Sequence, residues 1–223
     1  MDFGYIFKIL LRGKWLILTA IIVPAVAAFL YVSTLEKSFK SEALISTGVL
    51  GSAGLDPEED RPYLQSDLIK MSFNTYVTKI QSASMLRLLG YKMLMHELDS
   101  NNEPFRTLEA EKVDEVNAVN LQRLYDHMAE RFEGLNGGMF DASIEKDYQE
   151  VAEAFNFDIE ALKDNLTVYR SGETDYLGIT YKSENKFLSA FLLNELCNLF
   201  LSSMKYDQQK ELVEKFDLQP QNQ

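Results

Sequence analysis

A stretch without a single charged residue, from residue 15 to residue 32, most constrains what this chain can form. About 20 helical residues cross the roughly 30 Å hydrocarbon core of a bilayer. Two residues interrupt the apolar run without excluding a membrane helix. The hydroxyl of Thr19 can bond to its own helix, and proline, here Pro24, is commoner in membrane helices than in soluble ones. Aromatic residues stand near both ends, where such rings prefer the headgroup level. We therefore predict a transmembrane helix over residues 15–33, with these anchor residues: Trp15, Leu16, Pro24, Phe29 and Tyr31.

The charges that flank this stretch indicate its orientation. Lys8, Arg12 and Lys14 precede it and are opposed only by Asp2, whereas lysines and glutamates balance after it. Positively charged flanks tend to stay in the cytoplasm. We therefore expect residues 1–14 to form a cytoplasmic amphipathic lead-in, and the chain after the helix to lie across the membrane.

Two other interpretations of the stretch stay open. Residues 25–27, Ala-Val-Ala, resemble the cleavage site of a signal peptide, but the apolar run continues past them and exceeds a usual signal core. A buried core helix of a soluble domain is the second alternative. An uncleaved anchor fits the length and the flanks better than either.

The rest of the chain has the composition of an acidic soluble domain. The 223 residues carry a formal net charge of −12, which makes nucleic acid a poor partner because phosphates require a basic surface. The single cysteine, Cys197, excludes a disulfide within the chain, and we interpret it as a small apolar residue of a helix. We expect one domain over residues 34–216. The polar tail over 217–223 looks like a cut, or like a helix that continues elsewhere.

Period-two patterns predict three strands in this domain. Alternating residues indicate a strand over 43–49, followed by a loop rich in glycine, proline and acidic residues. Residues 166–170 and 176–182 indicate a hairpin around the turn at 171–175. Because an isolated hairpin is marginal, we expect the first strand to join it in one small antiparallel or mixed sheet. This sheet should lie near the membrane, since the first strand follows the anchor closely.

Helical spacing predicts long helices between and after the strands. One is expected over 66–98, bent or broken at Gly90, a second over 108–132, and a short one over 142–157. A long helix with Ser183 as its N-cap should run to about residue 216. Because strands and helices do not alternate regularly, the order indicates an α+β fold.

Residues typical of catalysis do not gather in this sequence. His96 and His127 each stand alone in a predicted helix, without the spacing of a zinc helix. The acidic loop lacks the glycine-turned spacing of a calcium site, and its glycines lack the Lys-Ser/Thr of a phosphate loop. We expect a protein that is not an enzyme and that needs no metal or cofactor.

Acidic residues decorate the predicted helix over 108–132, and we interpret them as a solvated face rather than a sugar site. Tyrosines that could stack on sugars are not singled out by any pattern. The acidic residues of this helix and the tyrosines are Glu109, Glu111, Asp114, Glu115, Glu130, Tyr63, Tyr76 and Tyr148.

Two segments together carry a more specific pattern. The first, WLILTAIIVPAVAAFLYVSTLEKSFKSEALISTGV, combines a membrane helix with a short strand. The second, NLTVYRSGETDYLGITYKSENKFLSAFLLNELCNLFL, combines two strands with a helix rich in Ala, Asn and Leu. Together they resemble the Wzz-type chain-length determinant proteins, or polysaccharide co-polymerases, which include exopolysaccharide export subunits. Phe39 stands where tyrosine is commoner, and Glu184-Asn185 replaces the usual Asp-Pro.

The resemblance implies a non-enzymatic protein of the bacterial inner membrane with a periplasmic α/β base and long helices. Such proteins form homo-oligomeric rings and set the length, or aid the export, of a polysaccharide made by partner polymerases. Family members carry a second membrane helix near the C-terminus, and some carry a cytoplasmic tyrosine kinase after it. Neither is visible in these 223 residues.

Apolar positions in the helices suggest where subunits of such a ring would meet. We expect the regions 66–98 and 108–132 to line these contacts, because their apolar residues exceed what a small sheet needs. The alternative is helix packing within one subunit. The methionines behind this expectation are Met71, Met85, Met93, Met95 and Met128.

A second function remains an alternative. The same anchor and α+β domain fit the extracytoplasmic sensing domain of a membrane-anchored receptor or adaptor. Such a domain would form a dimer and present a ligand pocket.

Overall fold

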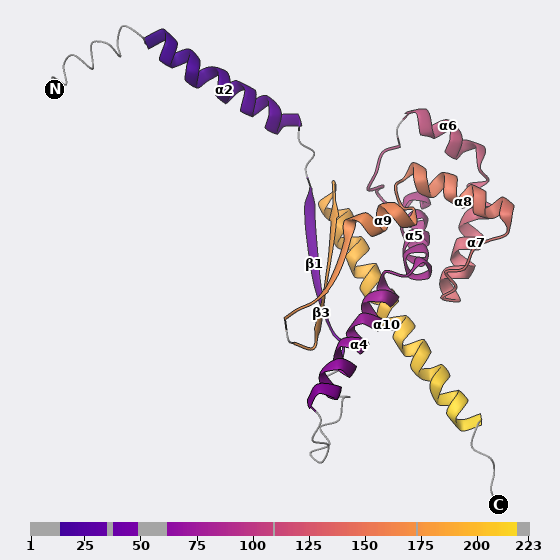
Figure 1. Ribbon diagram of the computed structural model, residues 1–223. Helices are drawn as coiled ribbons and strands as arrows, with labels where there is room; N and C mark the ends of the chain where they lie inside the picture. Colours follow the sequence, from indigo (N-terminus) through magenta and orange to yellow (C-terminus); the bar gives the residue numbers. More distant parts are fainter. Residues whose placement is uncertain (1–13, 35–37, 49–61, 109, 173, 218–223) are drawn as a thin grey trace, which may run out of the picture. The chain divides into compact units, whose positions relative to one another are not determined.

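The computed structural model describes residues 14–34, 38–48, 62–108, 110–172 and 174–217 (Figure 1). The chain divides into two units, Met1–Lys37 and Ser38–Gln223. The predicted lead-in, apart from Lys14, and the predicted tail, apart from Asp217, lie outside the described residues.

The first unit holds one described helix, α2, over Lys14–Thr34. Pro24 lies inside it, its first turn holds no acidic residue, and its last turn holds no basic one. A helix of this length rises about 31 Å, which matches a hydrocarbon core. The mixture of helices with a small antiparallel sheet in the second unit confirms the predicted α+β class.

The second unit contains a three-stranded antiparallel sheet. The sheet contains β1 (Phe39–Ser46), β2 (Leu166–Arg170) and β3 (Tyr176–Ser183) in the order β1-β3-β2. Ile179 of the central strand pairs with Ala43 on one side and with Val168 on the other. The prediction that the first strand joins the hairpin is thus confirmed.

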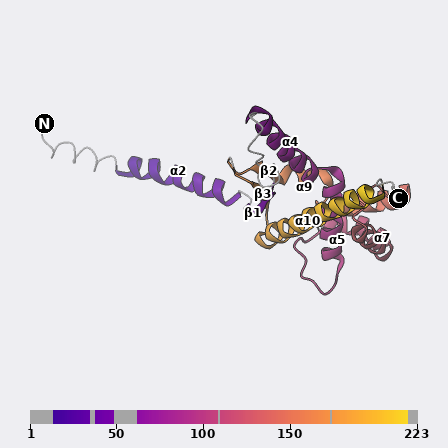
Figure 2. The ribbon, with the colours of Figure 1, turned by 90° about the horizontal axis from the view of Figure 1, so that it is seen from below.

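The long helix α10 (Lys186–Asp217) covers one face of this sheet (Figures 1 and 2). Alternation along β3 turns Leu177, Ile179 and Tyr181 to this face, where all three are buried. Leu188, Leu192 and Leu196 of α10 are buried as well, at the four-residue spacing of one helix face. One part of the core of the domain therefore lies between the sheet and α10.

The predicted helix over 66–98 is two helices, α4 (Pro62–Ile80) and α5 (Ala83–Leu98). The two helices are separated at Ser82, the N-cap residue of α5. Its backbone is extended, and its hydroxyl accepts a hydrogen bond from the Met85 amide. Gly90, where a break or bend was predicted, lies inside α5, so the predicted break is wrong. A Cβ there would lie 2.8 Å from both the Phe157 carbonyl oxygen and the Tyr148 hydroxyl. The glycine allows close packing of α5 and does not end the helix.

The predicted helix over 108–132 is also divided. The structure has α6 (Ala110–Ala118) and α7 (Leu121–Glu133), and Asn120 caps the second through its side-chain oxygen. The short predicted helix appears as α8 (Ala142–Ala154). A further helix, α9 (Ile159–Asn165), was not predicted; the Asp158 carboxylate caps it.

The predicted cap of α10 is wrong by two residues. Ser183 is the last residue of β3, and its hydroxyl donates to the Asn185 carbonyl oxygen. The Asn185 side-chain oxygen accepts from the Phe187 amide at 2.9 Å and so caps the helix.

Most of the methionines expected at subunit contacts lie in the core of a single subunit. Met85, Met93 and Met128 are buried, and Met95 packs partly buried against the core. Met71 on α4 is exposed. Because α5 contacts α7, α8, α9 and α10, these side chains join one helix to the next, and they no longer support an intersubunit role.

Candidate functional site: an apolar helix and a hollow between two helices

The structure places the predicted anchor residues on α2. Trp15, Phe29 and Tyr31 are 71%, 73% and 68% exposed, as expected of side chains that contact lipid. Pro24 lies inside the helix and Leu16 on its first turn. Of the predicted positive flank, Lys14 starts the helix, whereas Lys8 and Arg12 lie outside the described residues. The anchor role of these residues stays a prediction.

Length and composition alone select a different helix as a candidate membrane span. Among the described residues, Lys186–Lys210 of α10 is long and apolar enough, and the apolar part Leu18–Val32 of α2 is shorter. A core helix of a soluble domain passes the same test. Because α10 buries one face against the sheet, its apolar residues have a role in the core.

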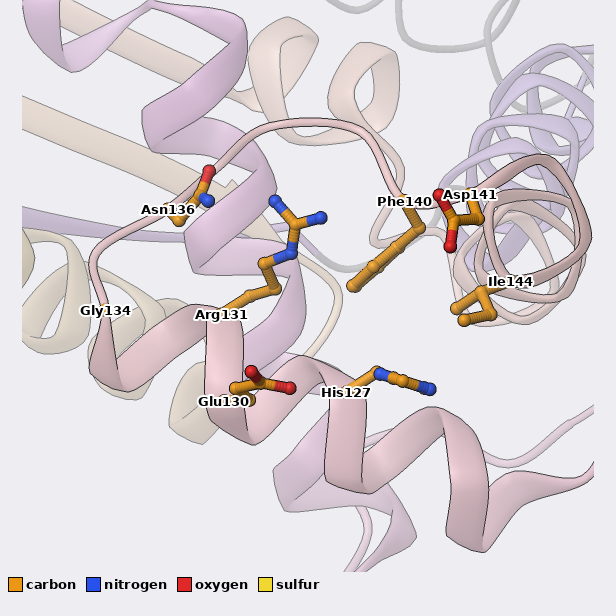
Figure 3. A pocket seen from close by; sticks show the side chains of 8 residues that line it. All are labelled: His127, Glu130, Arg131, Gly134, Asn136, Phe140, Asp141 and Ile144. Atoms are coloured by element: carbon orange, nitrogen blue, oxygen red, sulfur yellow. The ribbon is translucent and has the colours of Figure 1, made fainter.

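A hollow of about 460 Å³ opens in the second unit between the end of α7 and the start of α8. Figure 3 shows side chains from α7 on one side of it, and Phe140, Asp141 and Ile144 on the other. The lining is mostly polar or ionic. Its members are His127, Glu130, Arg131, Gly134, Asn136, Phe140, Asp141 and Ile144.

Arg131 is held in place at the wall of this hollow. Its guanidinium lies over the Phe140 ring, 5.3 Å from the ring centre, and donates to the Met139 carbonyl oxygen at 3.3 Å. The His127 ring lies 6.4 Å from the same Phe140 ring. The cation–π contact fixes the orientation of the guanidinium without neutralising its charge.

The loop that closes the hollow, residues 134–141, is fixed by hydrogen bonds from several directions. The Asn136 amide donates to the Arg131 carbonyl at 2.8 Å, and the Asn136 side-chain oxygen accepts from the Gly138 amide. The hydroxyl of Tyr91, which lies on α5, donates a hydrogen bond to the Gly138 carbonyl oxygen. A Cβ at Gly137 would lie 2.1 Å from the Ser84 carbonyl oxygen, so only glycine fits there.

A buried ion pair anchors the end of this loop. Glu145 of α8 accepts two hydrogen bonds from Arg87 of α5, at 2.6 and 2.8 Å, and a third from the Phe140 amide at 3.0 Å. The side chains of Arg87 and Glu145 are both about nine-tenths buried. The pair therefore links the core of the helical layer to the wall of the hollow.

Sequence patterns do not reveal this hollow. They indicate a surface or satisfied residue at His127 and place Glu130 on one acidic helix face. That face is divided, because Asp114 lies on α6 and Glu130 on α7. Asp141 could be recognised only as a possible helix cap, since its approach to α7 depends on how the loop folds.

The two residues that depart from the Asp-Pro pattern make specific contacts. Glu184 accepts hydrogen bonds from the Arg106 guanidinium at 2.5 and 3.2 Å, and this contact lowers the pKa of its carboxyl. The Asn185 side chain donates to the Phe105 carbonyl at 3.1 Å. Glu184 and Asn185 thus hold the α5–α6 connection against the start of α10.

Comparison with known proteins bears on the N-terminal part of the chain. No curated protein and no solved structure matches this chain. Residues 1–89 match the family model described as Wzz, Chain length determinant protein. The matched residues hold α2, β1 and α4 and end within α5. The match confirms the predicted resemblance to Wzz-type chain-length determinant proteins and supports a general role in determining polysaccharide chain length.

Proposed function

We propose that this protein is a non-enzymatic scaffold of the bacterial inner (plasma) membrane that regulates the chain length or export of a surface polysaccharide. The observation that carries the proposal is the family match over residues 1–89. It spans an apolar helix and the first strand of the sheet, in the order that the sequence pattern predicts. Regulation of this kind requires surfaces and assembly rather than reactive groups.

In this proposal α2 crosses the bilayer and contacts membrane lipid, and the second unit lies in the periplasm. The apolar length of α2 and the aromatic residues at its ends suit a membrane-spanning role. The position of the sheet near the membrane, expected from the short link between Thr34 and Phe39, belongs to the same proposal.

The proposed assembly is a homo-oligomeric ring that meets the polysaccharide polymerase or export machinery. The buried methionines no longer argue for it, but other apolar side chains remain on the surface. Met71 of α4 and three residues of α10 are between 46% and 65% exposed; the three are Leu201, Tyr206 and Val213. These faces suit contacts between subunits.

A deletion and complementation experiment tests the function. Deleting the gene in its host should broaden or shift the length distribution of a surface polysaccharide, seen on gels of the extracted polymer. Re-expression of the chain should restore the distribution, whereas a chain lacking residues 1–37 should not. An unchanged polymer in the deletion strain contradicts the proposal.

Topology and assembly are tested on the detergent-solubilised chain. N-terminal sequencing should read the uncleaved start, whereas a mature protein that begins at Ala28 would contradict the anchor. Mass photometry should show assemblies larger than a dimer. A dimer would instead favour the sensing-domain alternative.

A further inference from the structure

We propose that the hollow between α7 and α8 binds an uncharged, hydroxyl-rich ligand, namely a sugar residue of the polymer. The inference rests on the proposed function, because that function supplies a polysaccharide. It adds a binding site to that function. The residues of this site lie outside the segment 1–89 that matches the family model.

The first observation is that three charged side chains at the hollow have no ion-pair partner among the described residues. Glu130, Arg131 and Asp141 line the same hollow, and among the described residues none of them takes part in an ion pair. Asp141 is the N-cap residue of α8, yet its carboxylate makes no capping hydrogen bond. Three charged groups around one hollow therefore have hydrogen-bonding capacity left for a ligand.

The chemistry of these groups selects the kind of ligand. Carboxylates only accept hydrogen bonds and a guanidinium only donates them, whereas the amide of Asn136 does both. A sugar hydroxyl can donate to the carboxylates and accept from Arg131 at the same time. With two carboxylates against one guanidinium, the hollow repels anions, which favours an uncharged sugar residue.

The hollow also offers an apolar wall. Phe140 and Ile144 line it beside the polar groups, and Figure 3 shows the Phe140 ring directed between Arg131 and His127. Both side chains are more than nine-tenths buried, so they offer only a small apolar edge, which a carbon–hydrogen group of a sugar can touch while its hydroxyls reach the ionic groups.

Rigidity supports the assignment. The wall formed by residues 134–141 is held by the Tyr91 hydroxyl, by Glu145 and by the tight contact of Gly137 with Ser84. A site that is fixed before binding loses little conformational entropy when a ligand enters. The fixed loop explains how a shallow surface site can hold one unit of a flexible polymer.

Photo-crosslinking in polysaccharide-producing cells tests the site even though the sugar is unidentified. The full chain carries p-benzoylphenylalanine in place of Met139, which neighbours Phe140 and is 66% exposed. A second chain carries it in place of Met71 of α4, which is 65% exposed and serves as the control. After irradiation, glycan attached to the purified protein is measured by periodate staining. We expect at least about tenfold more glycan at position 139, the difference that one or two charge-assisted hydrogen bonds make.

Charge-removing variants at the hollow provide the specific test. Glu130→Gln with Asp141→Asn keeps the shape of both side chains, and no capping hydrogen bond is lost because the Asp141 carboxylate makes none. This pair should lower the crosslinked glycan at position 139 by about tenfold or more. The matched pair Glu133→Gln with Glu153→Gln removes one charge from each of the same two helices at exposed positions and should leave the signal unchanged.

The outcomes separate this site from the proposed function. Equal glycan at positions 139 and 71, or equal loss with both variant pairs, overturns the site even where deletion of the gene alters the polymer. An unchanged polymer in the deletion strain overturns the proposed function, whatever crosslinks at position 139. Thermal unfolding of each variant shows whether the fold is kept.

Discussion

The Arg87 guanidinium holds both carboxylate oxygens of Glu145 at 2.6 and 2.8 Å, in the packed layer between α5 and α8. Glu145 also accepts from the Phe140 amide and, at 3.2 Å, from the Gln149 side chain. One buried carboxylate thus satisfies donors from a neighbouring helix, from the loop of the hollow and from its own helix. The stability of the helical layer and the shape of the hollow depend on the same group.

We expect Arg87→Met to destabilise the second unit by about 3–5 kcal/mol, because it leaves a buried carboxylate without its cation. The double variant Arg87→Met with Glu145→Met should be less destabilised than either single variant, since no charge is then left unpaired. Denaturant unfolding of the detergent-solubilised chain, followed by circular dichroism, measures both values. Additive losses in the double variant would show that the two side chains act independently.

A second prediction concerns the approach of Gly90 to its neighbours. Gly90→Ala gains about 1 kcal/mol of helix propensity but places a methyl group 2.8 Å from the Phe157 carbonyl oxygen and the Tyr148 hydroxyl. Because the carbonyl belongs to the backbone, we expect a net loss of about 1–3 kcal/mol. Thermal unfolding should show a clear decrease in Tm; an increased Tm would mean that α5 can shift away.

The Tyr148 hydroxyl is itself an exception in this core. It is buried without a hydrogen-bond partner among the described residues, and burial raises its pKa. We expect Tyr148→Phe to change the stability by less than about 1 kcal/mol, because no hydrogen bond is lost. In that background Gly90→Ala should be less harmful, with a coupling of about 0.5 kcal/mol or more. Strict additivity in the double-mutant cycle would exclude the contact.

Sequence patterns predict well those features that depend on local spacing. The two strands of the hairpin and the buried face of α10 follow from alternation and from four-residue steps, and both appear in the structure. The one predicted break between helices is misplaced because glycine is the stronger signal in the sequence. Ser82 ends the continuous pattern by capping α5, whereas Gly90 is required by a contact with distant Phe157.

The hollow could not be predicted from the sequence for a similar reason. Its groups come from α7, from the following loop and from α8, and the loop is fixed by Tyr91 and Ser84 of α5. These contacts join residues about 50 positions apart, so no local pattern indicates them. Asp158 capping α9 is the contrary case: it is a local signal that was present in the sequence and was missed.

A fourth prediction concerns Arg106. Its guanidinium donates to the carbonyls of Phe155 and Asn156, binds Glu184 and lies 4.6 Å from the centre of the Phe157 ring. We expect Arg106→Lys to lose about 2–3 kcal/mol, because an ammonium cannot reach these partners in one plane. Glu184→Gln should be milder, since the Glu184 side chain is half exposed and the carbonyl contacts remain. Equal effects on Tm would mean that the ion pair, and not the carbonyl contacts, holds this junction.

The last prediction concerns the pH dependence of stability at His96. Its ring stacks on Phe105 with 4.3 Å between ring centres, lies 4.7 Å from Phe191, and buries an Nδ1 that has no partner among the described residues. Burial lowers the pKa of this imidazole, opposed by Asp99 and assisted by Lys92. The folded state therefore favours the neutral ring.

The sign of the effect follows from where protons bind. As the pH falls below the unfolded pKa of about 6.5, the unfolded chain takes up a proton that folded His96 refuses, so the folded state loses stability. The loss ends below the lowered folded pKa. Burial raises the pKa of neighbouring Glu97, which acts with the opposite sign, but this contribution cancels between the wild type and a His96 variant.

We therefore expect His96→Phe to flatten the decrease in unfolding free energy between pH 7 and pH 5, while keeping the aromatic stack. His96→Gln should flatten it equally but lower the stability at every pH, because the stack with Phe105 is lost. Denaturant unfolding at a series of pH values measures both effects. If both variants keep the slope of the wild type, then other groups cause the pH dependence and the buried imidazole has no part in it.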